Sequence, residues 1–311
     1  KDIVLYLTLK QSIKKIFIQW VMLVMLVSLA SVSHAKSLIL GSKNFTEQHI
    51  LSAMTVQYLE HNGFRLDART DLATIILREA LINQQIDFYW EYTGTSLIIF
   101  NHVTDKVSDE EAYHIVKTLD AKRDLVWLTP AKMNNTYAIA MRRDLAEKYA
   151  ISTVSDFATF INKQHQQGAK QWQLGFDIEF VGRSDGLAPM LDMYQFRLNR
   201  PQIRQMEAGL VYNAIRDDFV KAGLVYTTDG RINGFDLKVL EDDRHYFPSY
   251  NVAPVIRKEV LAKYPELEPL LNRLIPYLTN ETISRLNAQV DIEHKSINEV
   301  ANGFLKENGL L

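Results

Sequence analysis

The chain has 311 residues, of which 47% are hydrophobic and 23% are charged, a balance typical of a globular protein with one large domain or two ordinary ones. It contains no cysteine, which excludes disulfide bonds, a cysteine nucleophile and the lipid-modified cysteine of a lipoprotein. The net charge of −2 comes without a basic stripe, so we expect no nucleic acid partner.

The first 35 residues (1–35) have the pattern of a secretory signal peptide. Two lysines precede an apolar run over residues 16–32, and Ser33-His34-Ala35 places small residues at both ends of a cleavage site. An uncleaved membrane anchor is the alternative, although about 17 apolar residues lie at the short limit for a membrane span. We predict cleavage after Ala35 and a soluble periplasmic protein. Loss of four lysines and one aspartate with this segment changes the net charge from −2 to −5.

Strand and helix patterns alternate along the first part of the chain. Such alternation predicts an α/β fold. We expect Thr46 to cap the first helix and Asn62-Gly63 to end it. The predicted elements are strands at 37–41, 64–70 and 86–90, a first helix between its cap at Thr46 and its end at Asn62-Gly63, and helices at 71–83 and 108–119.

The second part of the chain contains the pattern of a second lobe, joined to the first lobe by two crossing segments. A strand at 135–141 opens this lobe, and a second crossing at 247–256 returns the chain to the first one. We therefore predict two mixed sheets flanked by helices, with a ligand cleft between the lobes. The predicted boundaries are 36–132 and 247–311 for lobe 1 and 133–246 for lobe 2. Further helices are predicted at 154–164, 187–194 and 210–220 and strands at 224–226 and 235–240; helices at 258–263, 267–277, 280–290 and 297–308 should pack on lobe 1.

The most informative stretch is Asp87 to Thr95, with sequence DFYWEYTGT. A buried strand that runs into this motif places Tyr92 and Thr95 at its carboxyl end, where open α/β sheets bind ligands. A core strand followed by a turn is the alternative. Three more tyrosines lie beside Gly, Asn, Thr or Pro in turn-rich segments, where loops carry function. These are Tyr137, Tyr226 and Tyr250.

Two cationic side chains lie in loops that precede helices. Lys43 adjoins a helix N-terminus, where the cation and exposed N–H groups attract an anion, although most single lysines are merely solvated. Arg183 lies in a turn and suits bidentate recognition of a carboxylate. A surface ion pair between Arg183 and Asp185, which contributes little stability, is the alternative.

Motifs for catalysis or metal binding are not found. The histidines are scattered without ligand spacing, and no nucleophile elbow or phosphate-binding glycine loop occurs. We predict no metal and no cofactor. Glu47, Glu91, Asp87 and Asp185 are candidate paired acids, but their spacing selects no two of them, so a hydrolase is unsupported.

Four tyrosines in one cleft would form an aromatic cage for a quaternary ammonium group. Such a cation cannot be hydrogen-bonded, and each ring face contributes about 0.5–2 kcal/mol by cation–π contact. Lys43, Arg183 and Thr95 could hold a carboxylate next to it. This combination describes a betaine site.

The chain resembles the substrate-binding proteins of ABC transporters for glycine betaine, carnitine and choline. The resemblance extends from about Leu38 to Leu305. Its six ordered motifs are Gly41 to Gln48 (GSKNFTEQ), Glu91 to Thr95 (EYTGT), Asn134 to Tyr137 (NNTY), Arg183 to Gly186 (RSDG), Thr228 to Ile232 (TDGRI) and Leu240 to Asp243 (LEDD).

This resemblance implies a type II periplasmic-binding-protein fold, no enzymatic activity, and a monomer that delivers its ligand to ABC transporter permease subunits in the inner membrane. It implies an osmoprotectant ligand of the glycine betaine type. The segment 70–74 departs from the usual glycine-containing turn, and Thr74 is matched there to a position that shapes selectivity. The implied caging residues are Tyr92 and Tyr250 from one lobe and Tyr137 and Tyr226 from the other, and the implied carboxylate-binding residues are Lys43, Thr95 and Arg183.

Two alternatives remain at this stage. A receptor of the same fold for an amino acid or other small cation needs a carboxylate for the ammonium group, and Asp185 or Asp229 would be the candidate. A periplasmic hydrolase would instead turn its ligand over.

Overall fold

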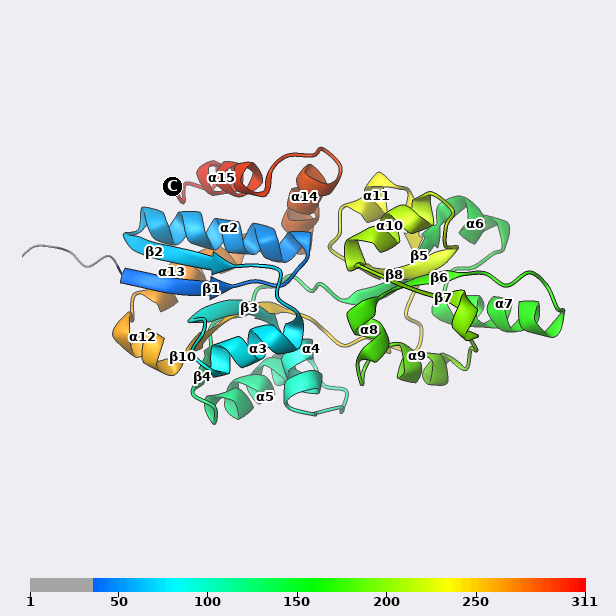
Figure 1. Ribbon diagram of the computed structural model, residues 1–311, viewed down its shortest axis with the longest axis horizontal. Coiled ribbons are helices and arrows are strands. Elements are labelled where there is room, and N and C mark those ends of the chain that lie inside the picture. The colour runs from blue at the N-terminus through cyan, green and yellow to red at the C-terminus, as the bar shows by residue number, and fades with distance from the viewer. Residues whose placement is uncertain (1–35) are drawn as a thin grey trace, which may run out of the picture. The chain divides into compact units, whose positions relative to one another are not determined.

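The computed structural model describes residues 36–311 (Figure 1). The predicted signal peptide at 1–35 lies outside the described residues. Within residues 36–311, no helix is both long enough and apolar enough to cross a membrane.

The first sheet has five strands in the order β2-β1-β3-β10-β4. β1 and β3 are parallel, whereas β10 runs antiparallel to both of its neighbours, so the sheet is mixed. All five residues of β3 are buried, as expected for a strand in the middle of a sheet covered on both faces. The strands are β1 (Lys36–Gly41), β2 (Phe64–Arg69), β3 (Phe88–Tyr92), β4 (Leu125–Trp127) and β10 (Val252–Arg257).

Helices from both ends of the described chain cover this sheet. The C-terminal helices α14 and α15 pack beside α2, as Figure 1 shows in red and blue, which confirms the predicted return of the chain to lobe 1. We use lobe 1 for the first sheet and these helices. They are α2 (Thr46–His61), α3 (Thr74–Ile82), α4 (Thr93–Thr95), the π-helix η1 (Ser96–Phe100), α5 (Asp109–Ala121), α12 (Lys258–Lys263), α13 (Leu267–Leu274), η3 (Ile275–Tyr277), α14 (Asn280–Asp291) and α15 (Ile297–Glu307).

The second sheet is also mixed, with the order β7-β6-β8-β5-β9. β6 is parallel to β7 and β8, and β5 is antiparallel to β8 and β9. Lobe 2 denotes this sheet with its helices. The strands are β5 (Tyr137–Arg142), β6 (Leu174–Asp177), β7 (Ile203–Met206), β8 (Ala222–Tyr226) and β9 (Leu237–Val239), and the helices are α6 (Arg143–Lys148), α7 (Val154–Gln166), α8 (Ile178–Gly182), α9 (Leu187–Tyr194), η2 (Arg200–Gln202), α10 (Ala208–Arg216) and α11 (Arg231–Gly234).

The two crossings lie side by side. Asn134 and Asn251 form an isolated antiparallel bridge, and the Tyr250 amide donates to the Asn134 side-chain oxygen at 2.8 Å. The prediction that the second crossing extends to residue 256 is wrong, because Val252–Arg257 forms β10, an interior strand between β3 and β4. Pro254, which is unusual inside a sheet, obscured the strand in the sequence.

Several predicted helix ends are also wrong. Thr46 does not cap α2: Phe45 occupies the N-cap position, and the Thr46 hydroxyl donates instead to Asp291 at 2.9 Å. The helix predicted at 71–83 begins only at Thr74. The helix predicted at 210–220 ends at Arg216, and Asp218 then has a left-handed backbone conformation with φ of 62°.

Candidate ligand-binding site

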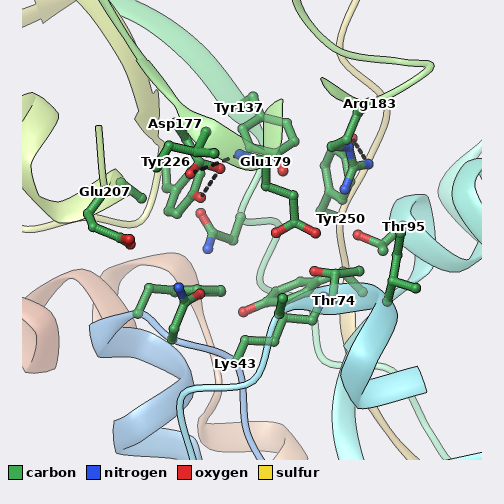
Figure 2. Close-up of a pocket in the computed structure, with 18 residues that line it drawn as sticks. Lys43, Thr74, Thr95, Tyr137, Asp177, Glu179, Arg183, Glu207, Tyr226 and Tyr250 are labelled. Atoms are coloured by element: carbon green, nitrogen blue, oxygen red, sulfur yellow. Dashed lines mark hydrogen bonds between the residues drawn. The ribbon is translucent and has the colours of Figure 1, made fainter. Parts of the chain in front are cut away.

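A cavity of about 370 Å³ is lined by residues of both lobes. Figure 2 shows the side chains that surround it. All eight predicted ligand-binding residues lie in its wall, although their contact with a ligand stays a prediction. They are Lys43, Thr74, Tyr92, Thr95, Tyr137, Arg183, Tyr226 and Tyr250.

The sheet topology explains why four tyrosines from distant segments meet. Tyr92 and Tyr226 are the last residues of β3 and β8, and Tyr137 is the first residue of β5. Tyr137 is paired with Tyr226 across the strands, and Tyr92 is paired with Val252, two residues after Tyr250. β5 follows the first crossing and brings Tyr137 next to Tyr226 at the end of β8. In the same way, β10 follows the second crossing and brings the preceding Tyr250 near Tyr92 at the end of β3.

The rings form a connected aromatic wall. The centroid of Tyr137 lies 5.4 Å from that of Tyr226 and 5.2 Å from that of Tyr250, with interplanar angles of 60° and 80°. Phe45 links the remaining ring, because its centroid lies 5.3 Å from Tyr226 and 6.2 Å from Tyr92. Phe45 was missed in the sequence, where an aromatic side chain beside a helix start resembles an ordinary core residue.

Three of the four tyrosine hydroxyls donate hydrogen bonds to carboxylates. Tyr92 donates to Glu47 at 2.6 Å, Tyr250 donates to Asp185 at 3.1 Å, and Tyr226 donates to Asp177 at 3.4 Å. Burial raises the pKa of each of these phenols, which keeps them neutral. These bonds hold the rings of Tyr92, Tyr226 and Tyr250 by their polar tips.

Glu47 connects the two lobes through hydrogen bonds next to Tyr92. Besides the bond from Tyr92, its carboxylate accepts hydrogen bonds from Thr228 at 2.5 Å and from Asn135 at 3.0 Å. Burial raises its pKa, and the three hydrogen bonds oppose this rise. The Glu47 carboxylate of lobe 1 thus bonds to Tyr92 of its own lobe, to Asn135 of the first crossing and to Thr228 in a turn of lobe 2.

Lys43 is buried rather than solvated. Its ammonium lies 2.7 Å from Glu91 and 5.1 Å from the centre of the Tyr92 ring. The Glu91 carboxylate also accepts from the Tyr89 hydroxyl at 2.9 Å and the Tyr92 amide at 2.7 Å. Lys43 therefore already has an internal counter-ion, and only its remaining N–H groups are left for a ligand.

Arg183 also has an internal partner. Its guanidinium makes two bonds of 2.7 Å to Asp185, and both side chains are about nine-tenths buried, so this is not the surface pair considered from the sequence. The guanidinium also lies 5.6 Å from the centre of the Tyr137 ring. Arg183 lines the cavity, whereas Asp185 does not.

Three acidic residues that the sequence analysis did not single out lie in the lobe 2 wall. They are Asp177, Glu179 and Glu207. Burial, with the charge of Glu179 as a smaller contribution, raises the pKa of Asp177 to about 6. Asp177 ends β6, Glu179 follows it in α8, and Glu207 comes directly after β7, so all three lie at or just past strand ends, where α/β sheets carry ligand groups.

The carboxylates named for the alternative functions lie elsewhere. None of Glu47, Glu91, Asp87 and Asp185 lines the cavity. Asp229, the other candidate for holding an ammonium group, forms a two-bond pair with Arg231 and borders a separate small space.

Two mixed sheets flanked by helices, with an aromatic cavity between the lobes, define the type II fold of the periplasmic binding proteins. Residues 36–307 match the family described as the substrate-binding domain of the ABC-type glycine betaine transport system. The chain belongs to this family, which confirms the resemblance drawn from the motifs. Members of the family bind substrates for transport.

Individual relatives agree with this assignment. A glycine-betaine-binding protein of Pseudomonas aeruginosa is 46% identical over 91% of both chains. The glycine betaine-binding protein YehZ of Escherichia coli is 32% identical over 91% of this chain and 96% of its own. A solved glycine betaine/carnitine/choline ABC transporter protein has a TM-score of 0.70 and 29% identity, covering 88% of this chain and 99% of its own.

Proposed function

We propose that this protein captures a quaternary ammonium osmolyte of the glycine betaine and choline type in a tyrosine cage and delivers it to an ABC permease. The observation that carries this proposal is the connected wall of Tyr92, Tyr226, Tyr137 and Tyr250 around one cavity. Several ring faces around a space without a metal-binding cluster suit a methylated cation, which gains cation–π contact and needs no hydrogen bond.

The location of the four rings also suits a closing receptor. Tyr92 ends a strand of lobe 1, Tyr137 and Tyr226 lie in strands of lobe 2, and Tyr250 lies on the second crossing. A ligand that contacts all four rings therefore favours the arrangement in which the lobes are closed on it. Delivery to permease subunits in the inner membrane requires a periplasmic location, for which the N-terminal segment predicts export.

Calorimetric titration of residues 36–311 with glycine betaine and with choline tests this function. Saturable binding of either compound, without binding of unmethylated glycine, is the expected result. Tighter binding of glycine would replace the proposal by an amino acid receptor. Conversion of the ligand to a product, followed by mass spectrometry of the incubated mixture, would indicate a hydrolase instead.

A further inference from the structure

The charges that line the cavity are not balanced. The two cations, Lys43 and Arg183, are each neutralised by a carboxylate outside the wall, at 2.7 Å in both pairs. Of the wall carboxylates, Asp177 accepts weak bonds from Tyr226 and from the Glu179 amide. No ion pair is found within residues 36–311 for any of the three acids.

Glu179 is half-buried and Glu207 is exposed, and neither carboxylate has a hydrogen-bond partner in the described part of the chain. Glu207 occupies the N-cap position of α10 but does not use its side chain to cap the helix. Figure 2 shows the Glu179 carboxylate extending from the lobe 2 side toward the middle of the cavity, between Tyr226 and Tyr250. Strong acceptors that face a cavity without a donor are suited to a ligand that brings one.

The opposite wall has the complementary property. Thr74 and Thr95 of lobe 1 are 4% and 3% exposed and line the same cavity, yet within residues 36–311 their hydroxyls have no hydrogen-bond partner. Buried hydroxyls usually find a partner. Their presence beside the cage is independent of the acidic residues and indicates that a polar group of a ligand completes this wall.

We call Asp177, Glu179 and Glu207 the acidic wall of the cavity. A bound metal ion does not account for these three carboxylates. Among the described residues, no group of three or more acidic or histidine side chains has the arrangement of a metal site. Trimethylammonium groups have no N–H to donate, so these carboxylates attract such a cation by charge alone and keep their hydrogen-bonding capacity for another part of the ligand.

We propose that Glu179 and Glu207, with Asp177 beside them, form an acceptor subsite for an O–H or N–H donor on the ligand. The substrate class is therefore a quaternary ammonium compound that carries such a donor in addition to its methylated cation. This inference rests on the proposed function, because the cage must hold the cation for the donor to face lobe 2.

Two isosteric cations isolate the donor. Choline carries a hydroxyl where n-propyltrimethylammonium carries a methyl group, and the two have the same charge and the same cage-binding group. A site built to hydrogen-bond a hydroxyl discriminates strongly against the analogue without it. We expect the protein to bind choline at least about tenfold more tightly than the propyl compound in calorimetry.

The matched variants are Glu179→Ala and Glu207→Ala, in which the removed side chains have no partner to lose. The choline-to-propyl affinity ratio should fall toward one in at least one of them. Glu147→Ala, an exposed acid of α6 outside the cavity wall, should keep the ratio of the unmodified protein. Comparing the ratio removes the general effect of lost negative charge, which weakens both cations alike.

Equal affinities of the unmodified protein for both cations would overturn the acceptor subsite and leave the cage intact. A ratio that persists in both alanine variants would overturn it as well. Absence of binding for choline, the propyl compound and glycine betaine alike would instead overturn the proposed function, so the two failures are distinguishable.

Discussion

The hydroxyl of Tyr92 donates a hydrogen bond to the buried carboxylate of Glu47, with 2.6 Å between the two oxygens. Because Thr228 of lobe 2 donates to the same carboxylate, the orientation of a cage ring in lobe 1 depends on a residue of the opposite lobe. The relative position of the two lobes and the orientation of the Tyr92 ring are therefore coupled through the side chain of Glu47.

Removal of a cage ring should weaken ligand binding. Tyr92→Ala and Tyr226→Ala are each expected to reduce the affinity for glycine betaine or choline by about tenfold or more, because a ring face is lost. Tyr92→Phe keeps the face and serves as the control, with a smaller loss from the missing bond to Glu47. Unchanged calorimetric affinity in both alanine variants would contradict the cage.

The bond between the lobes contributes to stability. Thr228→Val keeps the shape of the side chain but removes the donor to Glu47, leaving that buried carboxylate with one partner fewer. We expect the free energy of unfolding to fall by about 1–3 kcal/mol in urea titrations. Thr159→Val provides the control, since Thr159 bonds only within α7. An equal loss in both variants would argue against a special role for the interlobe bond.

Lys43 should be needed for folding as well as for any ligand. Lys43→Met leaves Glu91, which is fully buried, without its counter-ion, and loss of one member of a buried pair costs about 3–5 kcal/mol. The double variant Lys43→Met, Glu91→Gln should recover much of this loss in urea unfolding. Additive effects of the two substitutions would show that the pair is not coupled.

Asp177 should make the protein less stable as the pH rises. Its pKa of about 6 lies above the ordinary value of 3.8, so the folded state holds a proton that the unfolded state releases, and stability falls as the pH rises from about 4 to 6. Asp177→Asn has no such proton and should be more stable than the unmodified protein by up to about 2 kcal/mol at pH 7.5. The difference should vanish near pH 3.5.

Thermal unfolding of the two proteins at both pH values measures this difference. A gain from Asp177→Asn that is the same at pH 3.5 and pH 7.5 would have a cause other than the titration of Asp177.

The features that could be predicted from the sequence are those that depend on a short local pattern. Tyr92, Tyr137 and Tyr226 lie at strand ends and Tyr250 lies two residues before β10, all next to turn-forming residues, and that signal is visible within a few positions of each tyrosine. The pairing of Lys43 with Glu91 was not predictable in this way, because 48 residues separate them and only the parallel pairing of β1 with β3 brings them together.

Other features were obscured by atypical residues. Pro254 argued against an interior strand, yet β10 is one, and β7 is a short strand at the edge of its sheet with two polar residues out of four. The acidic wall escaped notice because Asp177, Glu179 and Glu207 come from two segments that meet only in the folded lobe. Charged side chains in separate segments otherwise indicate solvated surface.

The late position of β10 in the chain has a consequence for how the protein acquires its structure. All strands of the second sheet lie within residues 137–239, whereas the first sheet lacks the strand between β3 and β4 until residues 252–257 are available. Lobe 2 can thus complete its core while lobe 1 still has an open edge on β3 and leaves β4 without a neighbouring strand. During synthesis, the lobe that begins first is therefore the lobe whose sheet is completed last.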